Sequence, residues 1–128
     1  RAGVVIASVD DLGGDRALLD QWVRWARLFV LTVGKEGAIV YYGGQQRRLP
    51  AYAVAEVDPT GAGDVFAAAY LVRLSEAGDP YEAAQYANCA ASFVVEGRGA
   101  ASVPTRDQVE WRLLHGRLRS CGANGEPA

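Results

Sequence analysis

Three short apolar runs constrain the fold of this chain more than any other feature. They cover Val4–Ala7, Leu28–Val33 and Ala38–Tyr42, and each is followed by glycine or polar residues. Runs of this length that are rich in β-branched residues are typical of strands buried on both faces. We therefore expect a sheet whose covering layers come from helices elsewhere in the chain.

The segments around these strands predict a polar loop, a helix and a hairpin. Polar residues at 8–11 indicate a loop after the first strand, with its carboxylates at the carboxyl end of that strand. Asp15 can cap a helix that runs through Arg27. Gly43-Gly44 indicates a hairpin, and the strand that follows is expected to end near Val57.

The second half of the chain predicts three further helices. Residues 65–74 are apolar apart from Arg73 and indicate a buried helix. Asp79 followed by proline starts a helix that runs to about Val95. Thr105 with glutamine three residues later starts a last helix through about Leu118.

This order of elements predicts one α/β domain with a largely parallel sheet and a hairpin insertion. Half of the 128 residues are hydrophobic, which is enough for a sizeable core. We expect residues 1–119 to form the domain and residues 120–128 to form a flexible tail.

Charge and hydropathy exclude several classes of protein. The formal net charge of −2 argues against binding to nucleic acid or to an anionic membrane. The longest uncharged stretch, Ala83–Val95, is too short and too polar to span a bilayer. Two distant cysteines and the lack of a signal peptide favour the cytoplasm. The lack of methionine and the start at Arg1 lead us to expect a fragment.

The segment from Asp58 to Asp64 carries the strongest chemical signal. Its two glycines and an alanine leave backbone N–H groups unobstructed at the start of a buried helix. Helix N-termini carry unpaired donors and a partial positive charge, and they bind phosphate. A carboxylate in that turn suits a reaction in which a hydroxyl loses its proton while it attacks phosphorus. The alternative is a capped turn in which Asp64 only complements the helix dipole.

The motif DPTGAGDVFAAAY resembles the C-terminal signature of the ribokinase-like sugar kinases, the PfkB family. The similarity extends to TVGKEGA at 32–38, to Ala87-Asn88 and to GRGA at 97–100, and it covers nearly the whole chain up to about His115. The resemblance implies the C-terminal half of a ribokinase-like, three-layer α/β/α fold. It also implies transfer of a phosphoryl group from ATP to a hydroxyl of a sugar or polyol.

The resemblance assigns roles to the residues of this motif. Asp64 corresponds to the catalytic base, and Ala62, Gly63 and the N–H of Asp64 correspond to the anion hole. Asp58 aligns with a loop that holds a monovalent cation, for which main-chain carbonyls suit K⁺. The candidate partners in that loop are Thr60, Val94, Gly97, Gly99 and Ser102. An ordinary glycine-rich helix end is the alternative reading.

The resemblance also implies a nucleotide site. Thr32, Gly34 and Gly37 would line the ribose and phosphates of ATP, together with Gly63. Asn88 corresponds to a position that contacts adenine in relatives, although an asparagine in a helix can equally form a structural hydrogen bond. The family often has an Asn-x-x-Glu motif that supports Mg²⁺ through water. Here Ser8–Asp11 stands in its place, so Asp11 is the candidate and a solvated loop is the alternative.

These inferences predict that the chain forms a half-site of a carbohydrate kinase, namely the ATP site, the anion hole and the catalytic base without the acceptor pocket. The predicted cofactors are ATP, Mg²⁺ and K⁺. A kinase for inositol, a nucleoside or a vitamin is the enzymatic alternative, and a noncatalytic nucleotide-binding or assembly module is the other. The expected partners are a small-molecule acceptor and the missing N-terminal half of the same protein. Since the acceptor pocket belongs to that half, we expect the chain alone to be inactive. Self-association into a homo-oligomer is also expected, because a sheet edge and apolar surface would be exposed.

Overall fold

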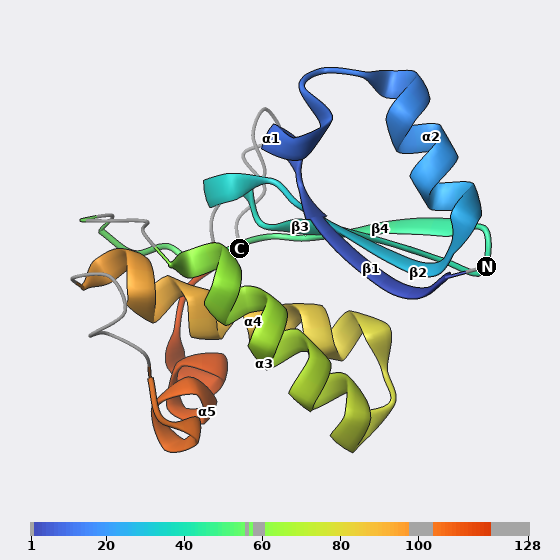
Figure 1. The fold of residues 1–128 in the computed structure, drawn as a ribbon. Coiled ribbons are helices and arrows are strands. Elements are labelled where there is room, and N and C mark those ends of the chain that lie inside the picture. The colour runs from blue at the N-terminus through green and yellow to red at the C-terminus, as the bar shows by residue number, and fades with distance from the viewer. Residues whose placement is uncertain (1, 56, 58–60, 98–103, 119–128) are drawn as a thin grey trace.

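The computed structural model describes residues 2–55, 57, 61–97 and 104–118. Its four strands form one sheet in the order β1-β2-β3-β4, and helices lie on both faces of the sheet (Figure 1). The strands are β1 (Ala2–Ser8), β2 (Ala26–Thr32), β3 (Ala38–Tyr42) and β4 (Gln45–Leu49). The helices are α1 (Val9–Leu12), α2 (Arg16–Trp25), the 3₁₀ turn η1 (Gly34–Glu36), α3 (Ala62–Ala77), α4 (Pro80–Glu96) and α5 (Arg106–His115).

The sheet is mixed, which corrects the expectation that it is largely parallel. Strands β1 and β2 are parallel and are joined through α2, whereas β2 with β3 and β3 with β4 are antiparallel. The reason is the length of the connections, since parallel neighbours need a crossover of roughly a dozen residues or more. Only Val33–Gly37 separates β2 from β3, and only Gly43-Gly44 separates β3 from β4. Both glycines of this second turn have positive φ, as a two-residue hairpin requires.

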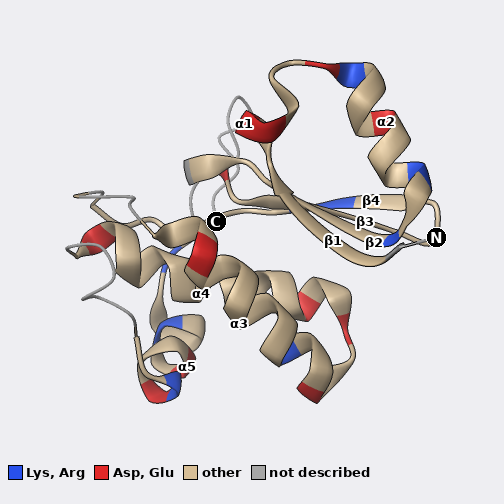
Figure 2. Cartoon of the chain, in the orientation of Figure 1, with Lys and Arg blue, Asp and Glu red and all other residues tan. Residues whose placement is uncertain are grey.

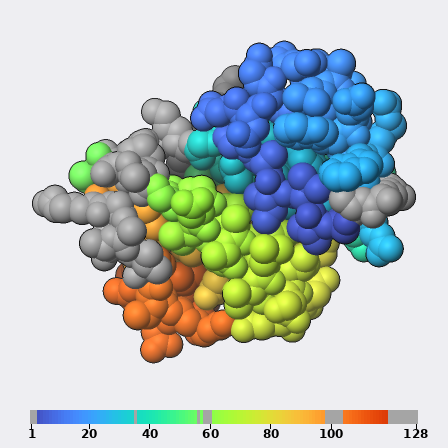
Figure 3. Space-filling model, in the orientation of Figure 1, coloured from blue at the N-terminus to red at the C-terminus, as the bar shows by residue number. Residues whose placement is uncertain are grey.

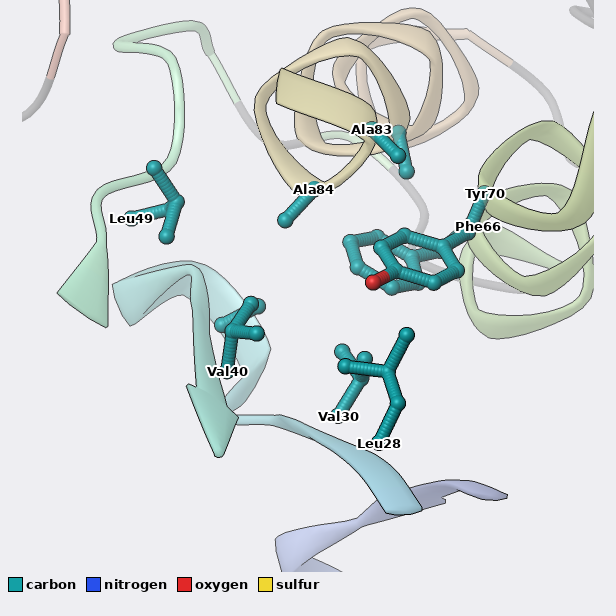
Figure 4. Packing of buried hydrophobic residues seen from close by; sticks show 10 residues of the cluster. Leu28, Val30, Val40, Leu49, Phe66, Tyr70, Ala83 and Ala84 are labelled. Carbon is teal, nitrogen blue, oxygen red and sulfur yellow. The ribbon is translucent and has the colours of Figure 1, made fainter. Parts of the chain in front are cut away.

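Alternate residues of the strands enter two different cores. Leu28 and Val30 pack with Phe66 and Tyr70 of α3 in the core shown in Figure 4. Phe29, between them in sequence, packs on the opposite face in the cluster that includes residues of α1 and α2. The period of two along a strand sends neighbouring side chains to opposite faces, so both faces of β2 are buried. The expected three-layer α/β/α arrangement is therefore present. In the space-filling view of Figure 3, the atoms of β1 lie directly against those of α3.

Four elements differ from the expectations drawn from the sequence. Helix α2 ends at Trp25 and not at Arg27, and helix α5 ends at His115 and not near Leu118. The strand after the hairpin ends at Leu49 and does not continue to Val57. Pro50 follows it and has no N–H to donate to a strand ladder. Residues 9–12, expected as part of a loop, form the short helix α1.

The helices begin close to the predicted positions. Asp79 caps α4, and Thr105 forms a capping box with Gln108 at the start of α5. Helix α2 ends at Trp25 because Ala26 already pairs with β1. Within the described ranges, no helix combines the length and the hydropathy that a bilayer span requires. The expected tail at 120–128 lies outside the described residues.

Candidate functional site

The first turn of α3 is formed by Ala62, Gly63 and Asp64, the residues that the sequence predicts as an anion hole and base. Gly61 precedes the helix with φ 87°, a left-handed conformation that glycine adopts without steric cost. The N–H of Val65 donates to the carbonyl of Gly61 over 3.0 Å, which begins the helical hydrogen bonding. Asp58 and Thr60 of the same motif lie outside the described residues.

The start of α3 differs from the starts of the other described α-helices. In α1, α2, α4 and α5 a side-chain oxygen accepts a hydrogen bond from the first turn; the capping residues are Ser8, Asp15, Asp79 and Thr105. Among the described residues, no side chain caps α3. Its N-terminal N–H groups are therefore the donors that this part of the chain leaves for an external acceptor.

The surroundings of this turn are open. Apart from its chain neighbours and the backbone of its own helix, no described residue places a heavy atom within 4 Å of a Cβ atom built on Gly63, which favours approach of a phosphate oxygen to the backbone there. The side chain of Asp64 is exposed in the same turn. The geometry thus presents backbone donors and a carboxylate on one accessible helix end.

Helix α1, turn η1 and the start of α3 lie at the same end of the molecule in Figure 1, and Figure 2 shows acidic residues in α1 and in the first turn of α3. The parallel strands β1 and β2 end there, with Ser8 opposite Thr32. The hydroxyl of Thr32 donates to the carbonyl of Ala7 over 3.4 Å, a bond that ties the two strand ends together. Ligands of open α/β sheets bind outside the carboxyl ends of the strands.

The two glycines after β2 serve different purposes. Gly34 has φ 57° and open space around its Cα, which agrees with the predicted close approach of a ligand. Gly37 has φ 108°, and a Cβ there would clash with the carbonyl of Leu49 and lie 2.8 Å from the N of Ala51. Gly37 therefore allows the backbone of Leu49–Ala51, and not a ligand, to approach closely.

Asn88 is buried and binds the same segment. Its Nδ2 donates to the carbonyl oxygens of Leu49, over 3.0 Å, and of Pro50, over 3.3 Å. These contacts support the structural hydrogen bond that the sequence left as the alternative to adenine binding. Asn88 and Gly37 together hold the end of β4, and nucleotide contact by either residue stays a prediction.

Asp11 caps α1. Its Oδ2 accepts from the N–H of Ser8 over 2.9 Å, and the hydroxyl of Ser8 accepts from the N–H of Asp10. The Asp11 side chain is exposed, so it suits Mg²⁺ held through water. Within the described ranges, no three His, Cys, Asp or Glu side chains lie close enough together to hold a metal, so Mg²⁺ would depend on phosphate and water for its other ligands.

Two candidate residues of the cation loop are described. The carbonyl of Val94 accepts from the N–H of Gly97 over 3.1 Å, and the neighbouring carbonyl of Val95 accepts from the N–H of Val57 over 2.6 Å. The last turn of α4 is thus tied to the segment that leads into the motif. Gly99 and Ser102 lie outside the described residues.

Two features of the site were not predicted from the sequence. One is the left-handed Gly61, for which the only signal was a glycine immediately before a helix. The other is the anchoring of Leu49 and Pro50 by Asn88. No local sequence pattern predicts this contact, because Asn88 is far from Leu49 and Pro50 in the chain.

A three-layer α/β fold in which no described side chain caps one helix start and a carboxylate lies in its first turn is typical of proteins that bind phosphate groups. Comparison with known families matches residues 6–106 to the model of the pfkB family carbohydrate kinases. The chain belongs to this family.

Curated relatives and solved structures agree with this assignment. Over 86 residues the chain is 44% identical to the ribokinase of Bacillus subtilis (strain 168). This match covers 66% of the chain and 29% of the ribokinase. Over 102 residues the chain is 30% identical to the nucleoside kinase of Methanocaldococcus jannaschii, covering 78% of the chain and 34% of the relative. The chain thus spans about a third or less of these proteins.

The fold is similar to solved structures of the same kind. The ribokinase of Thermotoga maritima superposes with a TM-score of 0.78 at 27% identity, over 87% of this chain and 42% of that one. The aminoimidazole riboside kinase of Salmonella enterica, solved with aminoimidazole riboside and an ATP analogue, superposes with a TM-score of 0.76 at 27% identity, over 88% and 42%. An Escherichia coli protein assigned as a ribokinase II, solved with ATP and Mg²⁺, superposes with a TM-score of 0.79 at 25% identity. The superposition covers 88% of this chain and 39% of that one.

Proposed function

We propose that this chain supplies the ATP-binding part and the catalytic base of a kinase that phosphorylates a hydroxyl of a sugar or polyol. The observation that carries the proposal is the start of α3, where backbone donors that no described side chain caps stand beside the exposed Asp64. Membership of the carbohydrate kinase family supports the same reaction.

The reaction follows from the chemistry of this turn. The carboxylate of Asp64 accepts the proton of the acceptor hydroxyl while the hydroxyl oxygen forms its bond to the γ-phosphorus and the bond to ADP breaks. The N–H groups of Ala62, Gly63 and Asp64 donate to the oxygens of the transferred group. Donors that are already oriented stabilise the charge that develops there without reorganisation.

ATP and Mg²⁺ fit the residues around this turn. Gly34 and Gly63 leave their backbone accessible, and Thr32 lies at the adjacent strand end. Asp11 would hold Mg²⁺ through water, and the metal would supply charge neutralisation between the phosphates. The complex of the E. coli relative with ATP and Mg²⁺ supports this choice of cofactors. Activation by K⁺ through the loops at Asp58 and at 97–102, and a cytoplasmic location, are further predictions.

The acceptor class is proposed from the relatives. They include a ribokinase, a nucleoside kinase and the 2-dehydro-3-deoxygalactonokinase of Haloferax volcanii, so the hydroxyl of a sugar or of a sugar-like polyol is the common feature. An ATP-consumption screen of the intact protein over pentoses, hexoses, nucleosides and inositols identifies the acceptor.

Replacement of Asp64 tests the proposal. In the intact protein Asp64→Asn should retain ATP binding and lower kcat by about 10²–10⁴-fold, the usual scale of general-base catalysis. Asp107→Asn is the matched control, because Asp107 is an exposed carboxylate in the first turn of α5 and should leave kcat unchanged. An Asp64→Asn enzyme with the turnover of the natural protein would exclude Asp64 as the base.

A further inference from the structure

A groove of about 800 Å³ lies between α2 and the hairpin of β3 and β4. It reaches Val9 and Leu12 of α1 and Val33 after β2, and its lining contains no residue of α3. Helix α2 packs on β2, and Ile39 and Tyr41 of β3 lie beside it on the same face of the sheet. Their partners across the hairpin are Arg48 and Gln46 of β4. All four residues line the groove, whose volume is within the range of roughly 300–1,000 Å³ that is usual for small-molecule sites.

Basic side chains dominate the charge of this groove. Four arginines line it against two aspartates, Asp15 and Asp20; the arginines are Arg16, Arg24, Arg27 and Arg48. One of the two carboxylates, that of Asp15, already accepts from the N–H of Leu18. The groove is thus locally positive in a chain of net charge −2.

The arginines of the groove differ from three arginines of the helices on the other side of the sheet. Within the part of the chain that the structure describes, none of the four forms an ion pair, whereas Arg73, Arg106 and Arg112 each bind a glutamate. A guanidinium group without a carboxylate partner keeps its five N–H donors for another acceptor. Phosphate oxygens match the geometry of these donors.

Tyr41 of β3 lines the groove, and its ring lies 5.8 Å from that of Phe29, which is fully buried and does not itself line the groove. Burial raises the pKa of Tyr41, while the charges of Arg16 and Arg48 act on its hydroxyl in the opposite direction. These two arginines come from the start of α2 and from β4, so both lie near the hydroxyl of Tyr41, where the carboxylate of Asp20 also acts on it.

Arg24 lies eight residues after Arg16 on α2, a separation of about 12 Å along the helix axis. Together with Arg27 at the start of β2, it forms a second basic end of the groove. We propose that the groove binds an elongated small molecule with a phosphoryl group at each end, a bisphosphorylated sugar or nucleoside, apart from the site at α3. A single phosphate would engage only one of the two basic ends.

Calorimetric titration of the intact protein tests this site, with a non-hydrolysable ATP analogue present to fill the nucleotide site. The probes are fructose 1,6-bisphosphate, adenosine 3′,5′-bisphosphate, fructose 6-phosphate and inorganic phosphate. We expect one of the two bisphosphates to bind at least tenfold more tightly than either single phosphate. The one that does so identifies the middle of the ligand as a sugar or a nucleoside.

Two adjacent arginines of β4 provide the matched variants. Arg48→Glu should weaken binding of that bisphosphate at least tenfold, because Arg48 lines the groove. Arg47→Glu should not, because Arg47 lies on the other face of the sheet, 5.0 Å from the ring centre of Tyr81. Arg16→Glu, on a different element, should repeat the effect of Arg48→Glu.

The proposal is overturned if no bisphosphate binds up to millimolar concentration, if inorganic phosphate binds as tightly as the bisphosphates, or if Arg47→Glu weakens binding as much as Arg48→Glu. Urea unfolding shows whether each variant is folded. If the Arg48→Glu variant does not fold, Arg48→Gln is used in its place. None of these outcomes depends on the assignment of Asp64, because the assay measures binding and not phosphoryl transfer.

Discussion

At the scale of single residues, replacement of Gly63 should affect ATP binding and catalysis without lowering the stability of the fold. Gly63 lies within the first turn of α3 with open space around it, so an added Cβ causes no clash. Gly63→Ala should leave the free energy of unfolding unchanged or raise it by up to about 1 kcal/mol, since alanine favours helix more than glycine. The methyl group would nevertheless occupy the approach to the backbone donors. We expect at least tenfold weaker ATP binding or a tenfold lower kcat in the intact protein.

Urea unfolding and ATP titration of the Gly63→Ala protein measure the two effects separately. Loss of stability together with loss of binding would show that the glycine is needed for the fold and not for the ligand.

Gly37 has the opposite character. Its φ of 108° is unfavourable for any residue with a side chain, and a Cβ would meet the backbone of Leu49–Ala51. Gly37→Ala should therefore lower the free energy of unfolding by roughly 3 kcal/mol or more, which combines backbone strain with a steric clash. Gly34→Ala is the control, because Gly34 also has positive φ but no atom within 4 Å, and it should lose only about 1 kcal/mol. Equal losses in urea unfolding would contradict the role of the Leu49–Ala51 contact.

At the scale of elements, Arg112 attaches α5 to the end of α4. Its guanidinium donates to the hydroxyl of Ser92 over 2.8 Å and to Glu96 over 2.7 Å, and it lies 3.8 Å from the ring centre of Phe93. The Arg112 side chain is 16% exposed, so solvent screens these bonds only in part. Arg112→Met should lower the free energy of unfolding by roughly 2–3 kcal/mol, the scale of hydrogen bonds to a charged group.

The control for Arg112 is Arg106. Arg106 also joins α5 to another helix through a bidentate pair with Glu76, but both side chains are more than 40% exposed. Arg106→Met should have little measurable effect in the same urea titration, because exposed ion pairs contribute little. A larger effect for Arg106 than for Arg112 would contradict the distinction between the two contacts.

The buried Cys89 belongs to this same interface between α4 and α5. Its Sγ donates to the carbonyl of Val109 over 3.4 Å, and burial raises the pKa of its thiol to about 12. The thiol therefore stays neutral at physiological pH and acts as a packing group rather than a nucleophile.

Elements were predicted well where the sequence marks both of their ends. Strand β3 has the predicted bounds, because glycines flank Ala38–Tyr42, and α4 begins after Asp79 as expected. The end of β4 was predicted wrongly although Pro50, which has no N–H for a strand ladder, follows it directly. The anchoring of this end by Asn88 could not be predicted, because Asn88 is distant in the chain. The candidate site follows the same rule. The turn of Asp64 is a local motif, whereas the groove needs arginines from separate elements that only the folded chain brings together.

At the scale of the whole molecule, the sheet has two edges, β1 and β4. Val4 of the edge strand β1 is 40% exposed, and Trp25, Leu71 and Leu114 are still more exposed. The curated and solved relatives are longer than this chain, which spans 29% of the Bacillus subtilis ribokinase. A protein made of these 128 residues alone should therefore self-associate through the β1 edge and the exposed apolar side chains, and it should phosphorylate no acceptor.

Light scattering and an acceptor screen on the isolated chain measure both properties. A charged residue at the edge, Val4→Lys, should reduce association, while Gln45→Lys on β4 is the comparison at the other edge. A monodisperse monomer that phosphorylates a sugar would overturn the half-site hypothesis.

The uncapped start of α3 has an evolutionary consequence. A serine or asparagine at position 61 with an extended backbone would complete the helix and stabilise it by about 1 kcal/mol, as caps generally do. The same oxygen would occupy the donors that a phosphate needs, so a more durable protein would be a poorer catalyst. Under selection for heat resistance alone, glycine at position 61 should therefore be replaced by a capping residue. Under selection for growth on the substrate, glycine should be restored. The stabilisation that the missing cap would give would then be supplied by the bound ligand in each catalytic cycle.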